Sequence, residues 1–210
     1  MTRKLEIEKL VIGQMEVNCY ICTDSESKTA VIIDPGDEAP YISDYLEKHT
    51  LRPTAILATH GHFDHIMAAF ALQHMYRIPF LIHSADAFLV GQMQHSARHF
   101  LGISTTDPPP HIDKTVDEND SISIGNKRIK LIHTPGHTPG SVSFVLQKTL
   151  IVGDVLFRGG SIGRTDFSYS NYDDLKSSLR KILSHVSDTV IYPGHGPATR
   201  VGDEQSILEN

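Results

Sequence analysis

Four short apolar segments of the chain each end in a turn that carries histidine or aspartate, and this pattern constrains the fold most. The segments are TAILATHGHFDH (54–65), IKLIHTPGH (129–137), LIVGD (150–154) and TVIYPGH (189–195). Short apolar runs that stop at glycine or proline are typical of buried strands. Because open sheets place their sites at strand ends, we expect the four turns to meet at one edge of the fold.

The rest of the chain alternates strand-like and helix-like segments. Further strands are predicted at 5–12, 16–23, 30–33, 80–83, 121–124 and 141–146. Apolar residues at helical spacing or helix-favouring composition predict helices at 39–49, 66–76, 85–93 and 171–185. Two successive blocks of strands, each closed by a helix, indicate two packed sheets with helices outside. No linker-like break divides the sequence, so residues 1–210 are predicted to form one domain.

Residues 94–114 show no clear periodicity and include three consecutive prolines at 108–110. This segment is predicted to be a loop that carries His95, His99 and His111 at the surface. Long loops in compact domains are often functional. We therefore expect this one to cover a substrate.

Composition excludes several classes of partner. Hydrophobic residues make up 40% of the chain, charged residues 21%, and the formal net charge is −6. This charge gives no reason to bind a polyanion, so nucleic acid is not an expected partner. The sequence contains neither an 18-residue apolar run nor a signal-peptide pattern, and a cytoplasmic protein without membrane contact is expected.

The two cysteines, Cys19 and Cys22, have the C-x-x-C spacing that is found in redox and zinc sites. The surrounding EVNCYICT is rich in strand formers. Residues three apart on a strand point to opposite faces, so the two sulfurs are expected to diverge. We predict a structural role for both rather than a disulfide or a metal pair.

The turns after the four strands supply seven ligand-type side chains: His60, His62, Asp64, His65, His137, Asp154 and His195. Imidazole and carboxylate groups together suit divalent transition ions. In a helix His60 and His62 would be rotated about 200° apart, but Gly61 allows a tight loop that aims both rings the same way. Asp64 and His65 would open the following helix, where a carboxylate is favoured.

The motifs T-H-x-H-x-D-H, T-P-G-H-T-P-G-S, G-D-x-L-F and Y-P-G-H-G together resemble the metallo-β-lactamase superfamily. The stretches GDVLFRGGSIGRTDF and IYPGHGPAT narrow the resemblance to small hydrolases similar to hydroxyacylglutathione hydrolase (glyoxalase II). The resemblance runs from VNCYI to PGHGPAT, nearly the whole chain. It implies an α/β fold, a four-layer αβ/βα sandwich of two mixed β-sheets flanked by helices, which agrees with the strands and helices predicted above.

The resemblance also implies a ligand set for two divalent metal ions per chain. His60, His62 and His137 would hold the first ion, Asp64, His65 and His195 the second, and Asp154 would bridge them. Zinc is the expected metal, with iron or manganese as alternatives.

Other residues are expected to support the site. Asp34 and Thr59 would orient metal-bound histidines, which generally donate their second ring N–H to a partner. Ser141 would either do the same or cap its turn, and His133 is interpreted as structural. Arg164 is a candidate for binding a substrate carboxylate, with a loop-bridging role as the alternative.

The expected chemistry is hydrolysis of a small acyl substrate. A water shared by two divalent ions about 3.5–4 Å apart ionises near neutral pH and can attack a bound carbonyl. Asp64 would act catalytically by accepting a hydrogen bond from this nucleophile. A thiol of reference pKa about 8.5 leaves without a strong general acid, so a thioester similar to S-acylglutathione is the favoured substrate.

The sequence departs from full glyoxalase II enzymes in ways that leave the substrate open. It is expected to lack their C-terminal helical substrate domain, it has an apparent extra glycine in FRGGSIGRTDF, and SYSNYDD replaces a more glycine-rich segment. Alternatives are a persulfide dioxygenase with one iron, a lactonase, and a non-catalytic metal-binding protein. The protein is expected to be a monomer or a homodimer.

Overall fold

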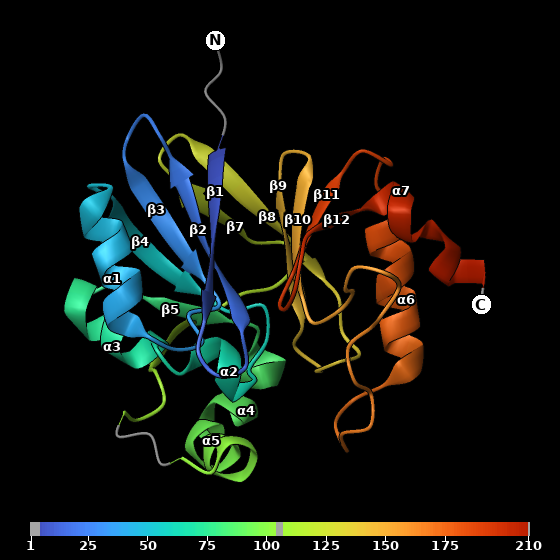
Figure 1. Ribbon diagram of the computed structural model, residues 1–210, viewed down its shortest axis with the longest axis horizontal. Helices are drawn as coiled ribbons and strands as arrows, with labels where there is room; N and C mark the ends of the chain where they lie inside the picture. Colours follow the sequence, from blue (N-terminus) through green and yellow to red (C-terminus); the bar gives the residue numbers. More distant parts are fainter. Residues whose placement is uncertain (1–4, 104–106, 210) are drawn as a thin grey trace.

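The computed structural model describes residues 5–103 and 107–209, so 104–106 of the predicted loop lie outside the described residues. Two six-stranded mixed sheets pack face to face, with helices on both outer sides (Figure 1). This arrangement confirms the predicted αβ/βα sandwich. Within the described ranges, no helix is long and apolar enough to cross a membrane.

The first sheet has the strand order β1-β2-β3-β4-β5-β6. Its strands are β1 (Leu5–Ile12), β2 (Val17–Asp24), β3 (Thr29–Ile33), β4 (Arg52–Leu57), β5 (Phe80–Ile82) and β6 (Ile112–Thr115). The second sheet has the order β12-β11-β10-β9-β8-β7. Its strands are β7 (Ser121–Ile124), β8 (Lys127–His133), β9 (Val142–Leu146), β10 (Thr149–Gly153), β11 (Val190–Pro193) and β12 (Thr199–Arg200).

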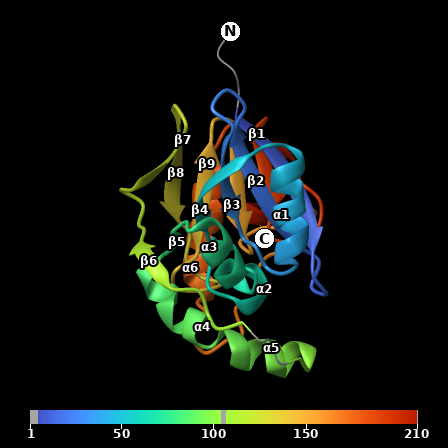
Figure 2. The ribbon, with the colours of Figure 1, turned by 90° about the vertical axis from the view of Figure 1, so that its left-hand side faces the viewer.

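Helices cover the outer face of each sheet and one end of the molecule. The first sheet carries α1 (Ala39–Lys48), α2 (Phe63–Ile66) and α3 (Ala69–Tyr76), and the second carries α6 (Tyr172–Leu183) and α7 (Val201–Glu204). The short helices α4 (Ala87–Gly91) and α5 (Met93–Leu101) lie beyond one end of the strands (Figure 2). Two 3₁₀ turns, η1 (Ser84–Asp86) and η2 (Gln205–Glu209), complete the fold.

Buried apolar side chains fill three layers, and β3 shows why. All five residues of β3 are buried. Val31 and Ile33 face the second sheet, whereas Ala30 and Ile32 face the helices on the other side. A strand buried on both faces reads as a continuous apolar run, as AVII does. On the opposite side of the molecule, α6 packs its apolar stripe onto the second sheet.

Parallel strand pairs in both sheets determine where ligand-type residues can gather. In the first sheet β3 pairs in parallel with β4, and in the second β10 pairs in parallel with β11. Parallel neighbours bring their carboxyl ends to the same edge of a sheet. The turns that follow all four strands carry ligand-type residues or a residue predicted to orient them.

Two predictions about local structure were wrong. The predicted loop at 94–114 contains α5, whose Met93 and Ala97 are buried, and the edge strand β6. The exposed polar residues of both elements hid them in the sequence, and β6 exists through parallel pairing with β5. The single helix predicted at 66–76 begins earlier and is divided into α2 and α3.

The cysteine prediction is confirmed. Both cysteines lie on β2 and are buried and free. Cys19 packs in the layer between the first sheet and its helices, whereas Cys22 packs between the two sheets. The sulfurs therefore lie on opposite faces of the strand.

Candidate metal centre

The structure brings all seven ligand-type side chains together at one edge of the sandwich. His60 and His62 follow β4, Asp64 and His65 lie in α2, and the other three follow strands of the second sheet. Three mutually close groups form: His60, His62 and His137; His60, His65 and Asp154; and Asp64, His65 and His195. Within each group the nearest ligand atoms lie within 4.8 Å of one another.

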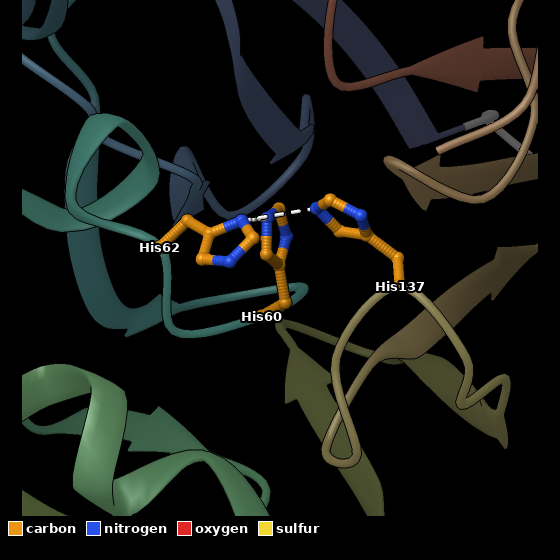
Figure 3. Close-up of side chains that lie close together, drawn as sticks. All are labelled: His60, His62 and His137. Carbon is orange, nitrogen blue, oxygen red and sulfur yellow. Dashed lines mark hydrogen bonds between the residues drawn. The ribbon is translucent and has the colours of Figure 1, made fainter. Parts of the chain in front are cut away.

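The first group consists of three imidazoles that face one another (Figure 3). Nδ1 of His62 lies 3.1 Å from Nε2 of His60 and 3.0 Å from Nε2 of His137. The outer nitrogens of two rings have other partners: Nδ1 of His137 donates to the Arg164 carbonyl (2.8 Å), and Nδ1 of His60 lies 3.0 Å from the Thr59 hydroxyl. These contacts assign the ring protons outward and leave lone pairs facing inward.

The group of Asp64, His65 and His195 combines two imidazoles and a carboxylate. Oδ2 of Asp64 lies 3.4 Å from Nε2 of His195 and 3.8 Å from Nε2 of His65. Here too the outer nitrogens are occupied, because Nδ1 of His195 donates to the Met15 carbonyl and Nδ1 of His65 pairs with Asp34. Both Nε2 atoms therefore point inward, toward the carboxylate of Asp64.

Asp154 lies between the two groups. Its carboxylate oxygens are 3.5 Å from Nε2 of His65, 3.6 Å from that of His137 and 3.7 Å from that of His195. In the described part of the chain, Oδ1 of Asp154 and Nε2 of His65 are two of three buried side-chain polar atoms without a hydrogen-bond partner. A buried polar atom without a partner is costly, and a divalent cation would satisfy both.

The electrostatics also suit a cation. Burial lowers the pKa of His60 and brings that of His62 to about 3, which keeps both rings neutral as metal ligation requires. Burial opposes the charge on His65, but Asp154, Asp64 and Asp34 outweigh it and raise its pKa to about 10. Three carboxylates around one ring thus create a local field that favours positive charge. The residues present fit a pair of divalent ions.

A glycine makes the approach of β11 possible. A side chain at Gly194 would collide with Oδ1 of Asp154 and with the ring of His65. Without a Cβ, the backbone before His195 can lie directly against the centre.

The family model of the metallo-β-lactamase superfamily matches residues 12–195. The chain belongs to this superfamily. Members of the superfamily are in general metal-dependent hydrolases, and the superfamily resemblance seen in the motifs is confirmed.

Several relatives match along most of their length. The hydroxyacylglutathione hydrolase GloC of Haemophilus influenzae is 35% identical over 96% of this chain and 95% of its own. The probable metallo-hydrolase YqgX of Bacillus subtilis is 35% identical over 94% and 93% of the two chains.

Solved structures share the fold of this chain. BLEG-1, a B3 metallo-β-lactamase, superposes with a TM-score of 0.86 at 36% identity, covering 98% of this chain and 100% of its own. TTHA1623 in a di-iron-bound form gives 0.84 at 33% identity, covering 96% of both chains. ETHE1 from Myxococcus xanthus, at 23% identity and a TM-score of 0.77, covers 97% of this chain and 83% of its own and shares the fold.

Two predicted supporting residues of this superfamily member orient its histidines. Asp34 pairs with His65 and accepts hydrogen bonds from the backbone N–H and the hydroxyl of Thr59, both at 2.7 Å. Ser141 instead caps its turn through Thr138, whose N–H it accepts at 3.2 Å. His133 lies outside the centre and stacks on His83 at 4.5 Å.

Sequence reasoning missed Asp86, a fully buried carboxylate after β5. It accepts hydrogen bonds from the N–H of Gly61 (2.8 Å) and from the hydroxyl of Thr138 (2.7 Å). It also accepts the N–H of Gly140 at 2.6 Å. Asp86 therefore ties the loop of His60 and His62 to the loop of His137. Its position at a strand end was the one available signal.

Tyr169 was also missed. Its hydroxyl lies 2.8 Å from Nε2 of His62. Because Nδ1 of His62 faces the other two imidazoles, Nε2 carries the proton and donates it to the tyrosine oxygen. Nothing in the sequence distinguished this tyrosine from the other residues of the segment.

Arg164, the predicted substrate ligand, borders the centre but its guanidinium is already engaged. It donates two hydrogen bonds to the exposed Asp166, at 2.9 and 2.7 Å, and lies 4.6 Å from the ring centroid of Phe167. A substrate carboxylate would have to compete with Asp166 for the same guanidinium N–H groups.

Proposed function

We propose that the protein hydrolyses thioesters of small acyl groups, using two divalent metal ions held by the seven ligand-type residues. The observation that carries this proposal is the pair of inward-facing ligand groups that Asp154 links. His60, His62 and His137 would hold one ion, Asp64, His65 and His195 would hold the other, and Asp154 would serve both. Zinc is the proposed metal, with iron as the alternative that the di-iron form of TTHA1623 supports.

When bound, divalent ions lower the pKa of water toward neutrality and polarise a carbonyl, which supplies the nucleophile and the electrophile. Asp64 orients the attacking water by accepting a hydrogen bond. Burial raises its pKa, but His65 and the hydrogen bond with His195 more than offset this, and the pKa lies below the ordinary value. The carboxylate is therefore ionised and able to accept.

The leaving group explains why a thioester is favoured over an amide. A thiol of pKa about 8.5 departs as thiolate without a proton donor. Tyr169 carries a hydroxyl proton beside the centre, and burial raises its pKa to about 12. Such a group is a weak acid at neutral pH, which suits a reaction that needs none. The name of the GloC relative, a hydroxyacylglutathione hydrolase, supports the same class.

The test combines metal analysis with substrate comparison. Protein purified without added metal should contain about two divalent ions per chain and should hydrolyse S-lactoylglutathione faster than a simple lactone. Hydrolysis of the lactone alone would contradict the proposed thioesterase activity and favour a lactonase. One iron per chain together with oxygen uptake on glutathione persulfide would exclude the hydrolase and favour a persulfide dioxygenase.

A ligand variant separates chemistry from folding. His62→Ala should abolish turnover and lower the metal content, while the circular dichroism spectrum stays that of the parent because the loop lies at the sheet edge. Full turnover in this variant at reduced metal content would contradict the mechanism.

A further inference from the structure

A cavity of about 150 Å³ opens directly onto the proposed metal centre. Five of the ligand-type residues border it: His62, Asp64, His137, Asp154 and His195. Most of its remaining lining is apolar or aromatic, from Met15, Phe63, Phe100, Phe167 and Tyr169. We name these five residues the aromatic slot. A group seated in the slot would lie next to the reacting carbonyl.

Two stacked pairs of rings build the slot from separate parts of the chain. Phe63 of α2 stacks on Phe100 of α5, with centroids 5.8 Å apart and planes 5° apart. Phe167 stacks on Tyr169 in the segment before α6, at 5.3 Å and 9°. Aromatic faces of this kind bind flat or flexible apolar groups through buried area and offset stacking.

The slot offers no free positive charge. Arg164 is the one arginine or lysine that borders this cavity in the described chain, and Asp166 neutralises it with two hydrogen bonds. An acyl group that ends in a carboxylate would therefore lose its hydration without gaining an ion pair.

Two apolar side chains of the slot remain partly exposed to solvent. Phe100 is 49% exposed and Met15 is 41% exposed, although both border a cavity. Apolar surface of this kind gains most when a ligand covers it.

The volume of the cavity gives the scale of a group that it can surround. An engineered apolar cavity of about 150 Å³ in another protein holds one benzene molecule. The whole cavity is of that size and is open on one side, so the slot can surround a phenyl ring or a straight chain of about six carbon atoms.

We propose that the aromatic slot binds the acyl half of the thioester and selects an uncharged, apolar acyl group of phenyl or hexanoyl size. This inference rests on the proposed function. In the reaction, a C–O bond forms between water oxygen and the acyl carbon. The C–S bond breaks, its electron pair goes to sulfur, and the products are the carboxylic acid and the thiol. The apolar chain stays in the slot throughout.

A substrate series with one constant, uncharged thiol tests the inference. N-acetylcysteamine thioesters of acetate, butanoate, hexanoate, phenylacetate and succinate would be assayed with the metal-loaded protein. Each added methylene should raise kcat/KM about fourfold up to hexanoyl. Phenylacetyl should rank with hexanoyl, and succinyl should fall at least tenfold below butanoyl because of its carboxylate. Equal rates for acetyl and hexanoyl, or preference for succinyl over butanoyl, would overturn the inference.

A slot variant and a matched control locate the effect. Phe100→Ala should lower kcat/KM for hexanoyl about tenfold more than kcat/KM for acetyl, because it removes one wall of the slot. Tyr41→Ala removes an equally exposed aromatic ring of α1, 51% exposed, and should change neither substrate. Equal losses for acetyl and hexanoyl in Phe100→Ala would show that the ring does not select the acyl group.

A binding measurement gives a readout without turnover. Hexanamide should bind at least tenfold more tightly than acetamide in calorimetry, and Phe100→Ala should remove this difference. If no thioester is hydrolysed above the buffer rate, the proposed function fails. If acetyl thioester is hydrolysed but chain length has no effect, only the aromatic-slot inference fails.

Discussion

Oδ2 of Asp34 lies 3.0 Å from Nδ1 of His65, and the same oxygen accepts the hydroxyl proton of Thr59 at 2.7 Å. Thr59 in turn accepts from Nδ1 of His60. One buried carboxylate therefore fixes the ring orientation of two histidines, His60 and His65, that are proposed to hold different ions. Hydrogen bonds of this kind make metal-bound imidazoles more basic and hold their lone pairs toward the ion.

Asp34→Asn should weaken metal binding without unfolding the protein. Asp34 has a backbone φ of +54°, a conformation that asparagine tolerates better than most residues. The amide removes the negative charge and one acceptor oxygen, and affinity for divalent metal should fall about 10–100-fold. Competition with a chelating dye measures this. Asp188→Asn, at an exposed ion pair with Lys148, serves as the control and should bind metal like the parent.

Asp86→Asn should destabilise the fold at the point where the two ligand loops are joined. Whichever way the amide turns, its NH₂ group faces a backbone N–H, either that of Gly61 or that of Gly140. An unsatisfied buried donor costs about 1–3 kcal/mol. Urea unfolding of the metal-free protein should show a lower midpoint with an unchanged slope. An unchanged midpoint would mean that the loops keep their positions without this carboxylate.

Tyr169→Phe should alter the metal environment and leave the aromatic wall in place. The variant removes the acceptor of the His62 Nε2 proton and retains the ring. Loss of such a partner lowers metal affinity or activity about 10–100-fold. The visible spectrum of the cobalt-substituted protein should shift, which loss of packing alone would not cause. Tyr172→Phe, an exposed tyrosine three positions later, is the matched control, and a spectrum identical in both variants would exclude the orienting role.

Both cysteines should resist thiol reagents in the native protein. Burial raises the pKa of Cys19 and of Cys22, and the thiolate is the reactive form. An aromatic disulfide reagent should therefore release no chromophore from native protein on the timescale of minutes, and two equivalents per chain after unfolding in guanidinium. Rapid reaction of the native protein would contradict this prediction and favour a redox role for the two cysteines.

The sandwich and the positions of the ligand-type residues could be predicted because their signals are local. AVII, TAILA and LIVGD show by composition alone that they are buried strands, and the side chains that follow must then lie at a sheet edge. Asp34 could be included for the same reason. That these residues bind two ions, and in which groups, remains a prediction.

The features that were missed depend on contacts between distant parts of the chain. Tyr169 meets His62 across 107 positions, and Asp86 meets Gly140 across 54. Neither residue follows a pattern that differs from an ordinary polar segment. Helix α5 was missed because Met93 and Ala97 alone mark its buried face among glutamine, histidine and arginine. Its contribution to the slot depends on the stacking of Phe100 on Phe63, a contact between separate parts of the chain.

Helix α5 and the segment 164–169 form much of the aromatic slot, yet neither carries any of the seven ligand-type residues. Natural variation in these two stretches can therefore reshape the substrate range while the reaction centre stays constant. A grafting experiment follows directly: exchanging α5 and 164–168 between homologues, with Tyr169 kept, should transfer preference for an acyl group and leave the metal content of the recipient as it was. In evolutionary terms, a single catalytic framework can give rise to enzymes with different substrates through substitutions in these two short segments.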